Sequence, residues 1–236
     1  MKRGDGHDGM QCIARIKVCI SLSVLVYPLV FLPNCKVQIP VGDIDRKPSF
    51  SEADRKFAHV YKPLDGTWRG KFHVYELKAE GDLPPSLAVA RPIIKGDWEP
   101  GPLVKAGALK LKQTIDVEQV YVSESPYFQR VRIRDAYLDA KGERRVIKSR
   151  GVNKVQDGVM WCVVRKPHEM VVHRGGTEGK DVIIWQRSLE SPRRIEYFHE
   201  TVRENSYTIR GWGYYGKHAP SRSPRLWFLG EYKRVK

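Results

Sequence analysis

Apolar and polar residues alternate with a period of two from Gly66 onward, and this pattern constrains the fold more than any other feature. Trp68, Phe72 and Val74 fall on one side of the first such segment, whereas the charged residues between them fall on the other. Alternation of this kind is typical of a β-strand with one buried and one solvated face. It predicts about ten strands, at 66–74, 109–117, 130–134, 144–155, 159–165, 169–173, 182–187, 194–202, 207–215 and 226–235.

The connectors between these strands are short and rich in turn-forming residues, as at 139–142, 156–158 and 175–179. Short connectors favour antiparallel pairing of consecutive strands, and the lack of long helical patterns excludes parallel crossover units. A meander removes its exposed edges by closing on itself. We therefore predict an all-β fold, an antiparallel up-and-down barrel of about eight to ten strands. Two longer connectors, 81–107 and 216–224, are expected to flank a mouth of the barrel.

The N-terminal region contains an apolar run of about 15 residues, 18–33, behind the basic residues Arg15 and Lys17. This length and charge order indicate a secretory signal, because a membrane span needs roughly 20 apolar residues. The run stops at Cys35, and Leu32-Pro33-Asn34-Cys35 resembles the lipobox of bacterial lipoproteins, whose cysteine is acylated. Lipidation of Cys35, ordinary cleavage nearby and an uncleaved helix are three alternatives. All three predict an exported protein of the bacterial cell envelope. Lipidation or an uncleaved helix would also anchor it in the membrane.

The chain accordingly divides into three parts. Residues 1–35 form a signal or anchor segment, residues 36–63 a polar tether with a short helix, and residues 64–236 the barrel domain. The helix is expected near 51–61, where Ser51-Glu52-Ala53-Asp54 has the residue classes of a capping box.

The cysteines predict a domain without disulfides. Cys12 and Cys19 fall in the signal segment and Cys35 at its end, which leaves Cys162 alone in the barrel. A domain of this size buries enough core without disulfide bonds. Cys162 lies in the apolar segment 159–164, so we interpret it as an inert buried thiol and not as a nucleophile.

Asp65-Gly66-Thr67-Trp68, at the head of the first strand, resembles the Gly-x-Trp signature that opens lipocalins and related calycin barrels. The resemblance implies a basic residue near the last strand that packs over Trp68, for which Arg225 and Arg234 are candidates. The chain departs from secreted lipocalins in lacking paired cysteines and a clear C-terminal helix. A lipocalin-like barrel implies a cup that holds a small apolar or amphipathic ligand without catalysis.

The alternation predicts which side chains line the barrel: Trp68, Phe72, Val74, Leu111, Ile115, Val131, Ile133, Trp161, Val163, Ile195, Tyr197, Ile209 and Phe228. The candidate ligand-binding residues among the interior positions are Trp68, Phe72, Trp161, Tyr197 and the neighbouring His199. His199 and Tyr197 share a face by the two-residue period, and His199 is an alternative haem ligand. The competing interpretation is a solid barrel whose side chains fill the interior.

The sequence contains none of the common catalytic motifs. The chain has no Gly-x-Ser-x-Gly, His-Glu-x-x-His or Cys-x-x-Cys pattern. The segment 175–180 resembles a phosphate loop, but its glycines are one residue too close and Asp181 stands where a hydroxyl is needed. We interpret 175–179 as a hairpin loop, and we predict no enzyme, no metal site and no required cofactor.

The formal net charge of +15 favours contact with anionic partners, with general solubility of a basic protein as the alternative interpretation. Arg130, Arg132 and Arg134 form an outward row, and the alternative function is an envelope interaction protein that contacts a polyanion or an anionic membrane through this row. Trp212 and Trp227 lie among basic residues near the C-terminus, either as a stacking patch or as covered strand residues. No nucleic-acid motif accompanies them, so nucleic acid is not an expected partner.

Overall fold

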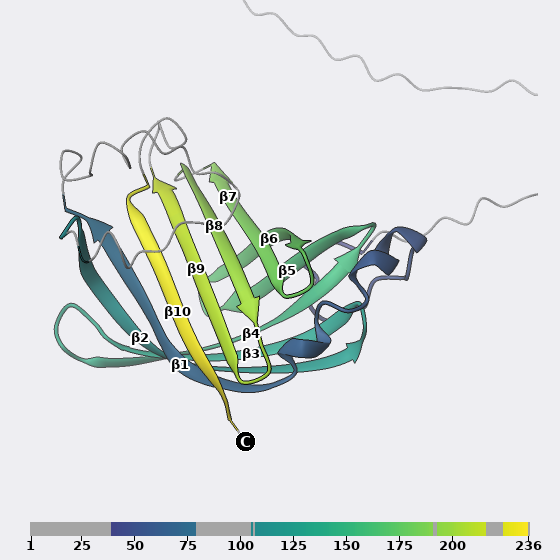
Figure 1. Cartoon of the computed structure of the whole chain (residues 1–236), viewed down its shortest axis with the longest axis horizontal. Coiled ribbons are helices and arrows are strands. Elements are labelled where there is room, and N and C mark those ends of the chain that lie inside the picture. Colours follow the sequence, from purple (N-terminus) through teal and green to yellow (C-terminus); the bar gives the residue numbers. More distant parts are fainter. Residues whose placement is uncertain (1–38, 79–104, 106, 191–192, 216–223, 236) are drawn as a thin grey trace, which may run out of the picture. The chain divides into compact units, whose positions relative to one another are not determined.

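Ten antiparallel strands form a closed barrel in which each strand pairs with its neighbours along the chain and β1 also pairs with β10 (Figure 1). The computed structural model describes residues 39–78, 105, 107–190, 193–215 and 224–235. The predicted up-and-down barrel is thereby confirmed. Its strands are β1 (Gly66–Leu77), β2 (Leu109–Ser125), β3 (Phe128–Leu138), β4 (Arg144–Gln156), β5 (Val159–Lys166), β6 (Glu169–Glu178), β7 (Val182–Glu190), β8 (Arg193–Val202), β9 (Ser206–Tyr215) and β10 (Leu226–Val235).

Pairing of the first and last strands closes the sheet. Trp68 of β1 lies opposite Gln119 of β2 on one side and opposite Arg234 of β10 on the other. Each of the ten described strands therefore has a partner on both sides, and none of them is an edge strand open to pairing with another chain. We call the end where β1 begins the base and the opposite end the mouth.

Two 3-10 helices, η1 (Glu52–Phe57) and η2 (Lys62–Leu64), pack against the base. The Asp54 carboxylate accepts hydrogen bonds from the backbone N–H of Ser51 at 2.8 Å and of Gly158, in the β4–β5 turn, at 2.7 Å. Half of the predicted capping interaction is thus present, and it also ties η1 to the barrel. The part of the predicted tether that the structure describes, 39–63, is therefore joined to the barrel core and not separate from it.

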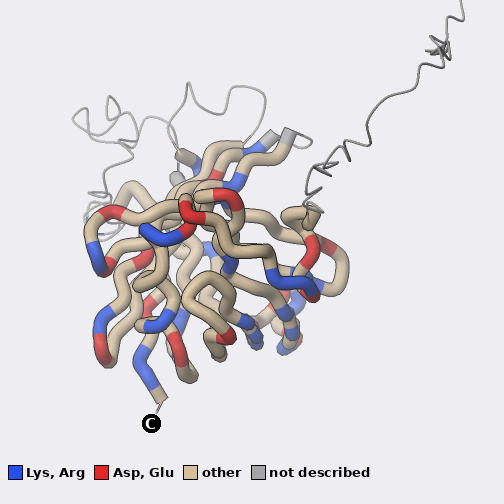
Figure 2. Tube along the Cα trace, turned by 90° about the vertical axis from the view of Figure 1, so that its right-hand side faces the viewer, with Lys and Arg blue, Asp and Glu red and all other residues tan. Residues whose placement is uncertain are grey.

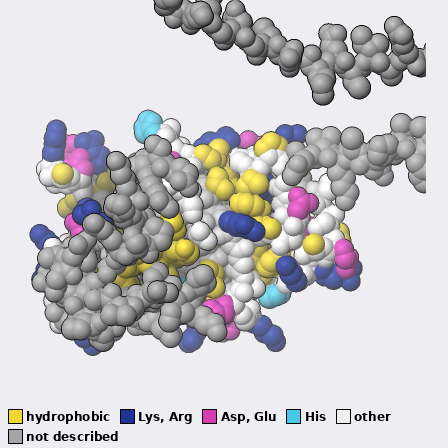
Figure 3. Space-filling view, turned by 90° about the horizontal axis from the view of Figure 1, so that it is seen from above, with side chains coloured by type: hydrophobic (Ala, Val, Ile, Leu, Met, Phe, Trp, Pro, Cys, Tyr) yellow, Lys and Arg dark blue, Asp and Glu magenta, His cyan; other side chains and the backbone are white. Residues whose placement is uncertain are grey.

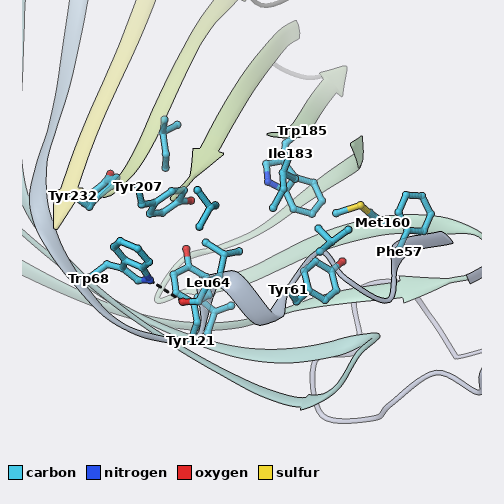
Figure 4. Close-up of a cluster of buried hydrophobic side chains, with 14 of the residues drawn as sticks. Phe57, Tyr61, Leu64, Trp68, Tyr121, Met160, Ile183, Trp185, Tyr207 and Tyr232 are labelled. Atoms are coloured by element: carbon cyan, nitrogen blue, oxygen red, sulfur yellow. Dashed lines mark hydrogen bonds between the residues drawn. The ribbon is translucent and has the colours of Figure 1, made fainter. Parts of the chain in front are cut away.

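A layer of aromatic side chains above these helices closes the base (Figure 4). The indole N–H of Trp68 donates to the carbonyl of Leu64 at 2.7 Å, and the Trp68 ring packs against Tyr207 with the centroids 5.7 Å apart. The ring centroids of Tyr232 and Tyr207 are 5.2 Å apart. Arg234 covers the other side of Trp68, so the basic partner that the Gly-x-Trp resemblance implied is Arg234 and not Arg225.

Two further hydrophobic clusters lie on the outer face of the barrel wall. One packs the segment before η1 onto β3, β4 and β5, and consists of Ile44, Phe128, Val152 and Val163. The other, the outer aromatic cluster, consists of Ala108, Leu109, Trp212, Tyr214 and Trp227. Trp212 and Trp227 are 3% and 1% exposed, so they do not form an exposed stacking patch. Both faces of β5 and β9 are therefore covered along part of their length.

One turn lies elsewhere than the sequence predicts. Strand β6 continues through Gly175 to Glu178, so the interpretation of 175–179 as a hairpin loop is wrong for all but its last residue. The physical reason is close packing, because Gly175 lies directly opposite Trp185 and has no room for a side chain. The signal segment, Cys35, most of 81–107 and most of 216–224 lie outside the described residues. None of the helices in the described part of the chain has the length and apolar character needed to cross a membrane.

Candidate functional site

A cavity of about 240 Å³ lies inside the barrel above the aromatic layer of the base. Seen from above, hydrophobic side chains gather toward the middle of the face and most Lys and Arg side chains stand at its margin (Figure 3). The cavity is bounded by inward-facing residues of all ten strands, with Asn153 as the contribution of β4. Its wall includes Phe72, Ile115, Val117, Val131, Ile133, Val164, Val171, Trp185, Phe198 and Ile209.

Stacked rings form one side of this cavity. Phe72 and Phe228 lie with their centroids 5.8 Å apart, and Phe228 and Phe198 lie 5.3 Å apart, both pairs nearly parallel. The His173 ring meets Phe198 edge-on at 5.4 Å. Gly211 lies between β8 and β10 in the sheet, and a Cβ there would stand 2.8 Å from Phe198. The glycine therefore leaves the space that the aromatic stack occupies.

Glu200 places a carboxyl group among the aromatic side chains of the cavity wall. Burial raises its pKa to about 7, although hydrogen bonds from Trp185 and Tyr207 oppose the rise. Glu200 as a residue is half-buried and is one of the residues that line the cavity. Near neutral pH the group therefore exists in both protonation states, and either state can hydrogen-bond a polar atom in the cavity.

Other polar side chains reach the cavity. Burial lowers the pKa of His173 to about 3, so its ring is neutral, and its buried Nδ1 has no hydrogen-bond partner among the described residues. Burial also raises the pKa of the Cys162 thiol and of Asp135. Cys162 is a free cysteine, as predicted, and its raised pKa is that of an unreactive thiol.

A cluster of charged side chains sits nearer the mouth. Arg187 is 7% exposed and contacts Glu196 at 3.5 Å and Glu169 at hydrogen-bond distance. Arg194 donates to the same Glu169 carboxylate at 2.6 Å, and the Tyr215 hydroxyl donates to Glu196 at 2.6 Å. The two arginines lower the pKa of Glu169 against the opposing effect of burial. Each buried charge thus has an opposite charge beside it, as its desolvation requires.

The structure brings only two of the five predicted ligand-binding residues inside the barrel. Phe72 lines the cavity, and Trp68 lies in the base below it. Tyr197 and His199 lie on the opposite face of β8 from the cavity-lining Phe198 and Glu200, so their predicted inward placement is wrong. An interior haem ligand at His199 has no support from this position.

The predicted inward placement of Trp161 is also wrong, because Trp161 packs with the outer cluster around Ile44 while the adjacent Cys162 faces the cavity. Val163 belongs to the same outer cluster. Leu111 is 50% exposed, because a bulge between Val74 and Tyr75 shifts the pairing of β1 with β2 and turns Leu111 outward. Ile195 shares the outward face of Tyr197.

Sequence reasoning did not place the charged side chains of β8 on the inner face of the barrel. Glu200, Glu196 and Arg194 alternate with Tyr197 and His199 along β8, and the charged set faces inward. The predicted alternation along β8 is correct, but the charged face of this strand, and not the face of Tyr197 and His199, points into the barrel. Cross-strand pairing shows which face of β8 points inward, because Glu196 lies opposite Arg187 of β7 and Gly213 of β9.

The predicted row Arg130, Arg132 and Arg134 does lie on the outer face of β3. Arg130 forms an ion pair with Glu124 at 3.0 Å and donates to the carbonyl of Ile44 at 2.7 Å. Lys and Arg positions recur on adjacent strands of the barrel (Figure 2). Within the part of the chain that the structure describes, no group of His, Cys, Asp and Glu side chains is arranged to hold a metal ion.

Comparison with known proteins gives likeness of fold alone. No protein-family model matches the chain, and no curated protein matches it. The S-type phycobiliprotein lyase CPES from Guillardia theta is similar with a TM-score of 0.45 and 8% identity, over 80% of this chain and 99% of that one. A redesigned β-barrel, mFAP0, bound to DFHBI, is similar with a TM-score of 0.33 and 11% identity, over 73% of this chain and 100% of that one.

Proposed function

We propose that the barrel binds a small, mainly apolar ligand in its interior cavity, with one hydrogen-bond donor of the ligand directed at Glu200. The observation that carries this proposal is the carboxyl group of Glu200 in a cavity whose wall is mainly aromatic and aliphatic. Ligand pockets are typically apolar with a few placed polar groups that set orientation. An amphipathic molecule with an amine or hydroxyl group matches that lining.

The size of the cavity restricts the ligand. Its volume of about 240 Å³ is below the range of roughly 300–1,000 Å³ that is usual for drug-sized ligands. The ligand is therefore expected to be compact, of the size of a few fused rings or a short chain. An anionic head group is disfavoured at the inner end because it would lie beside the Glu200 carboxylate.

The direct test is mass spectrometry of the full-length protein purified from its producing cells, under native and then denaturing conditions. A mass that is present in the native spectrum and absent after denaturation identifies a bound ligand. Binding of 1-aminoanthracene, followed by its fluorescence, provides a defined probe, and 9-anthroic acid provides the same ring system with an acid group. We expect the amine to bind more tightly than the acid.

A matched pair of variants localises the binding. Val171 lines the cavity, whereas Met170, its neighbour in β6, is 40% exposed on the outer face. Val171→Phe fills part of the cavity and should abolish binding of 1-aminoanthracene, while Met170→Phe should leave it unchanged. Equal binding by the two folded variants would show that the ligand does not occupy the interior.

We also propose that the chain is exported and anchored to a bacterial membrane through lipid on Cys35. The support is the sequence alone, namely the basic residues, the apolar run and the lipobox-like Leu32-Pro33-Asn34-Cys35. The test is metabolic labelling with a palmitate analogue during expression in bacteria. Label on the wild type and none on Cys35→Ala is the expected result. An unlabelled wild type would contradict lipidation and would leave two alternatives, cleavage of the signal without lipid or retention of an uncleaved helix. The mass of the mature chain distinguishes these two alternatives.

A further inference from the structure

Arginines face one another directly across three adjacent strands on the outer wall of the barrel. Arg132 of β3 pairs in register with Arg150 of β4, and Arg150 pairs with Arg165 of β5. One step along, Arg134 of β3 lies opposite Lys148 of β4. We call these five residues the arginine ladder. Like charges placed directly opposite each other on adjacent strands are destabilising, so the ladder works against the stability of the free protein.

Among the described residues, a carboxylate comes within salt-bridge distance of the ladder only at Arg165. Asp45 lies 3.9 Å from Arg165, and both side chains are exposed. Glu118 lies across from Arg134 in register, but its carboxylate is held by Arg69 at 2.5 Å. In the described parts of the chain, no carboxylate comes within salt-bridge distance of the other four ladder residues.

The ladder lines a hollow and does not stand on a flat or convex surface. A trough of about 790 Å³ is lined by the five ladder residues and Lys166, together with one acidic residue, Glu118, and uncharged residues that include Val120. A second hollow of about 400 Å³ shares Val120, Arg132 and Arg150 with the first and continues past Arg130. The two hollows are therefore adjacent and form an open trough across β2 to β5, in which Lys and Arg outnumber the acidic residues Glu118 and Asp45.

We propose that this trough is a binding site for an acidic polysaccharide, whose carboxylate or sulfate groups are held by the arginine ladder. Guanidinium groups bind such oxyanions through paired, charge-assisted hydrogen bonds. A linear chain carrying repeated negative charges would contact several ladder residues at once and would relieve their mutual repulsion. The site lies on the outside of the barrel and is independent of the interior cavity.

Features of the trough disfavour other polyanions. The described residues that line it include no aromatic side chain, so they offer no platform on which nucleic-acid bases stack. An extended acidic peptide gains affinity by pairing with a free strand edge, and the closed barrel presents none among its described strands. A bilayer surface is flat, whereas the trough is concave.

The test measures binding of the full-length protein to heparin oligosaccharides and to polygalacturonate, with neutral dextran as the blank. The ladder variant Arg132→Gln/Arg150→Gln is compared with Lys180→Gln/Arg203→Gln, which removes the same charge from exposed turns. Loss of two charge-assisted contacts should weaken binding of the acidic polysaccharides by at least about tenfold. The control variant should stay within about twofold of the wild type, since it alters only long-range attraction.

The melting temperature is a second measurement, in which the ladder variant is expected to gain stability although it loses binding. If the ladder serves binding, the ladder variant should melt at a higher temperature than the wild type in low salt, because cross-strand repulsion is removed. Equal loss of polysaccharide binding in both variants would overturn the proposal, since net charge alone would then explain it. Ladder-dependent binding to phosphatidylglycerol vesicles or to a single-stranded oligonucleotide, with none to either polysaccharide, would overturn it as well.

Discussion

The guanidinium group of Arg234 lies over the indole ring of Trp68, 4.3 Å from the ring centroid. The same guanidinium donates to the carbonyls of Pro63 and Glu204 at 2.7 Å each, and to that of Asp65. One side chain on β10 thus joins the start of β1, the helix before it and the β8–β9 turn. Because β1 and β10 are the first and last strands, this contact joins the two strands whose pairing closes the barrel.

We expect Arg234→Ala to lower the free energy of unfolding by about 2–4 kcal/mol, since it removes a cation–π contact and leaves three carbonyls without their donor. Arg234→Lys should recover only part of this loss, because an ammonium group lacks the planar fork of donors. Lys233→Ala, the exposed neighbour on β10, serves as the control. Urea denaturation monitored by tryptophan fluorescence measures all three. A loss for Arg234→Ala no larger than for Lys233→Ala would contradict a closing role.

The charged cluster near the mouth predicts a sharp contrast between two glutamates. Removing Glu196 leaves Arg187, 7% exposed, with part of its charge uncompensated, so Glu196→Ala should cost about 2–4 kcal/mol of stability. Glu118→Ala breaks an ion pair whose Arg69 side chain is 63% exposed and should cost less than about 1 kcal/mol. Thermal or urea unfolding gives both values. Similar costs for the two variants would mean that water reaches Arg187 freely.

Cys162 provides a test of how enclosed the cavity is. Burial raises the pKa of its thiol, and only the thiolate reacts rapidly with maleimides. We expect peptide mapping to find Cys162 unlabelled in the folded protein and labelled in urea. His168→Cys places a thiol at an exposed position of the β5–β6 turn and should be labelled in the folded state. Rapid native labelling at Cys162 would show that the barrel interior opens readily to solvent.

The architecture was predictable because it follows from local signals. Alternation located all ten strands, turn residues set their antiparallel order, and Gly66 and Trp68 marked the first strand. These signals depend on near neighbours in the sequence. Closure follows once a meander of this length must remove its edges.

The binding cavity was predictable only in part, because alternation separates two faces without saying which is inside. In β8 the inward face carries Arg194 and Glu196, which pair with opposite charges on other strands, and Glu200, whose pKa is raised by burial. In β5 the segment before η1 covers Trp161 on the outer wall, so both faces are apolar. Which face of these strands points inward depends on residues far away in the sequence, which no local pattern contains.

Glu200 provides the final prediction, a pH dependence with a definite sign. Burial raises its pKa from 4.5 to about 7 in the folded protein. A carboxyl group with a raised pKa stabilises the fold fully below pH 4.5, and this contribution is lost as the pH rises through about 7. His173, whose pKa is lowered to about 3, acts in the opposite direction between about pH 3 and its ordinary value of 6.5. The difference between wild type and Glu200→Gln cancels the contribution of His173 and isolates that of Glu200.

We expect Glu200→Gln to gain stability relative to the wild type between pH 5 and pH 8, by about 1–3 kcal/mol, because the amide never ionises inside the barrel. Urea denaturation at a series of pH values measures this difference. Glu178→Gln, an exposed glutamate of β6, should give a difference that is flat with pH. A flat difference for Glu200→Gln as well would mean that Glu200 ionises as it does in water. The carboxyl group would then be hydrated in the cavity, and a ligand would have to displace that water to reach it.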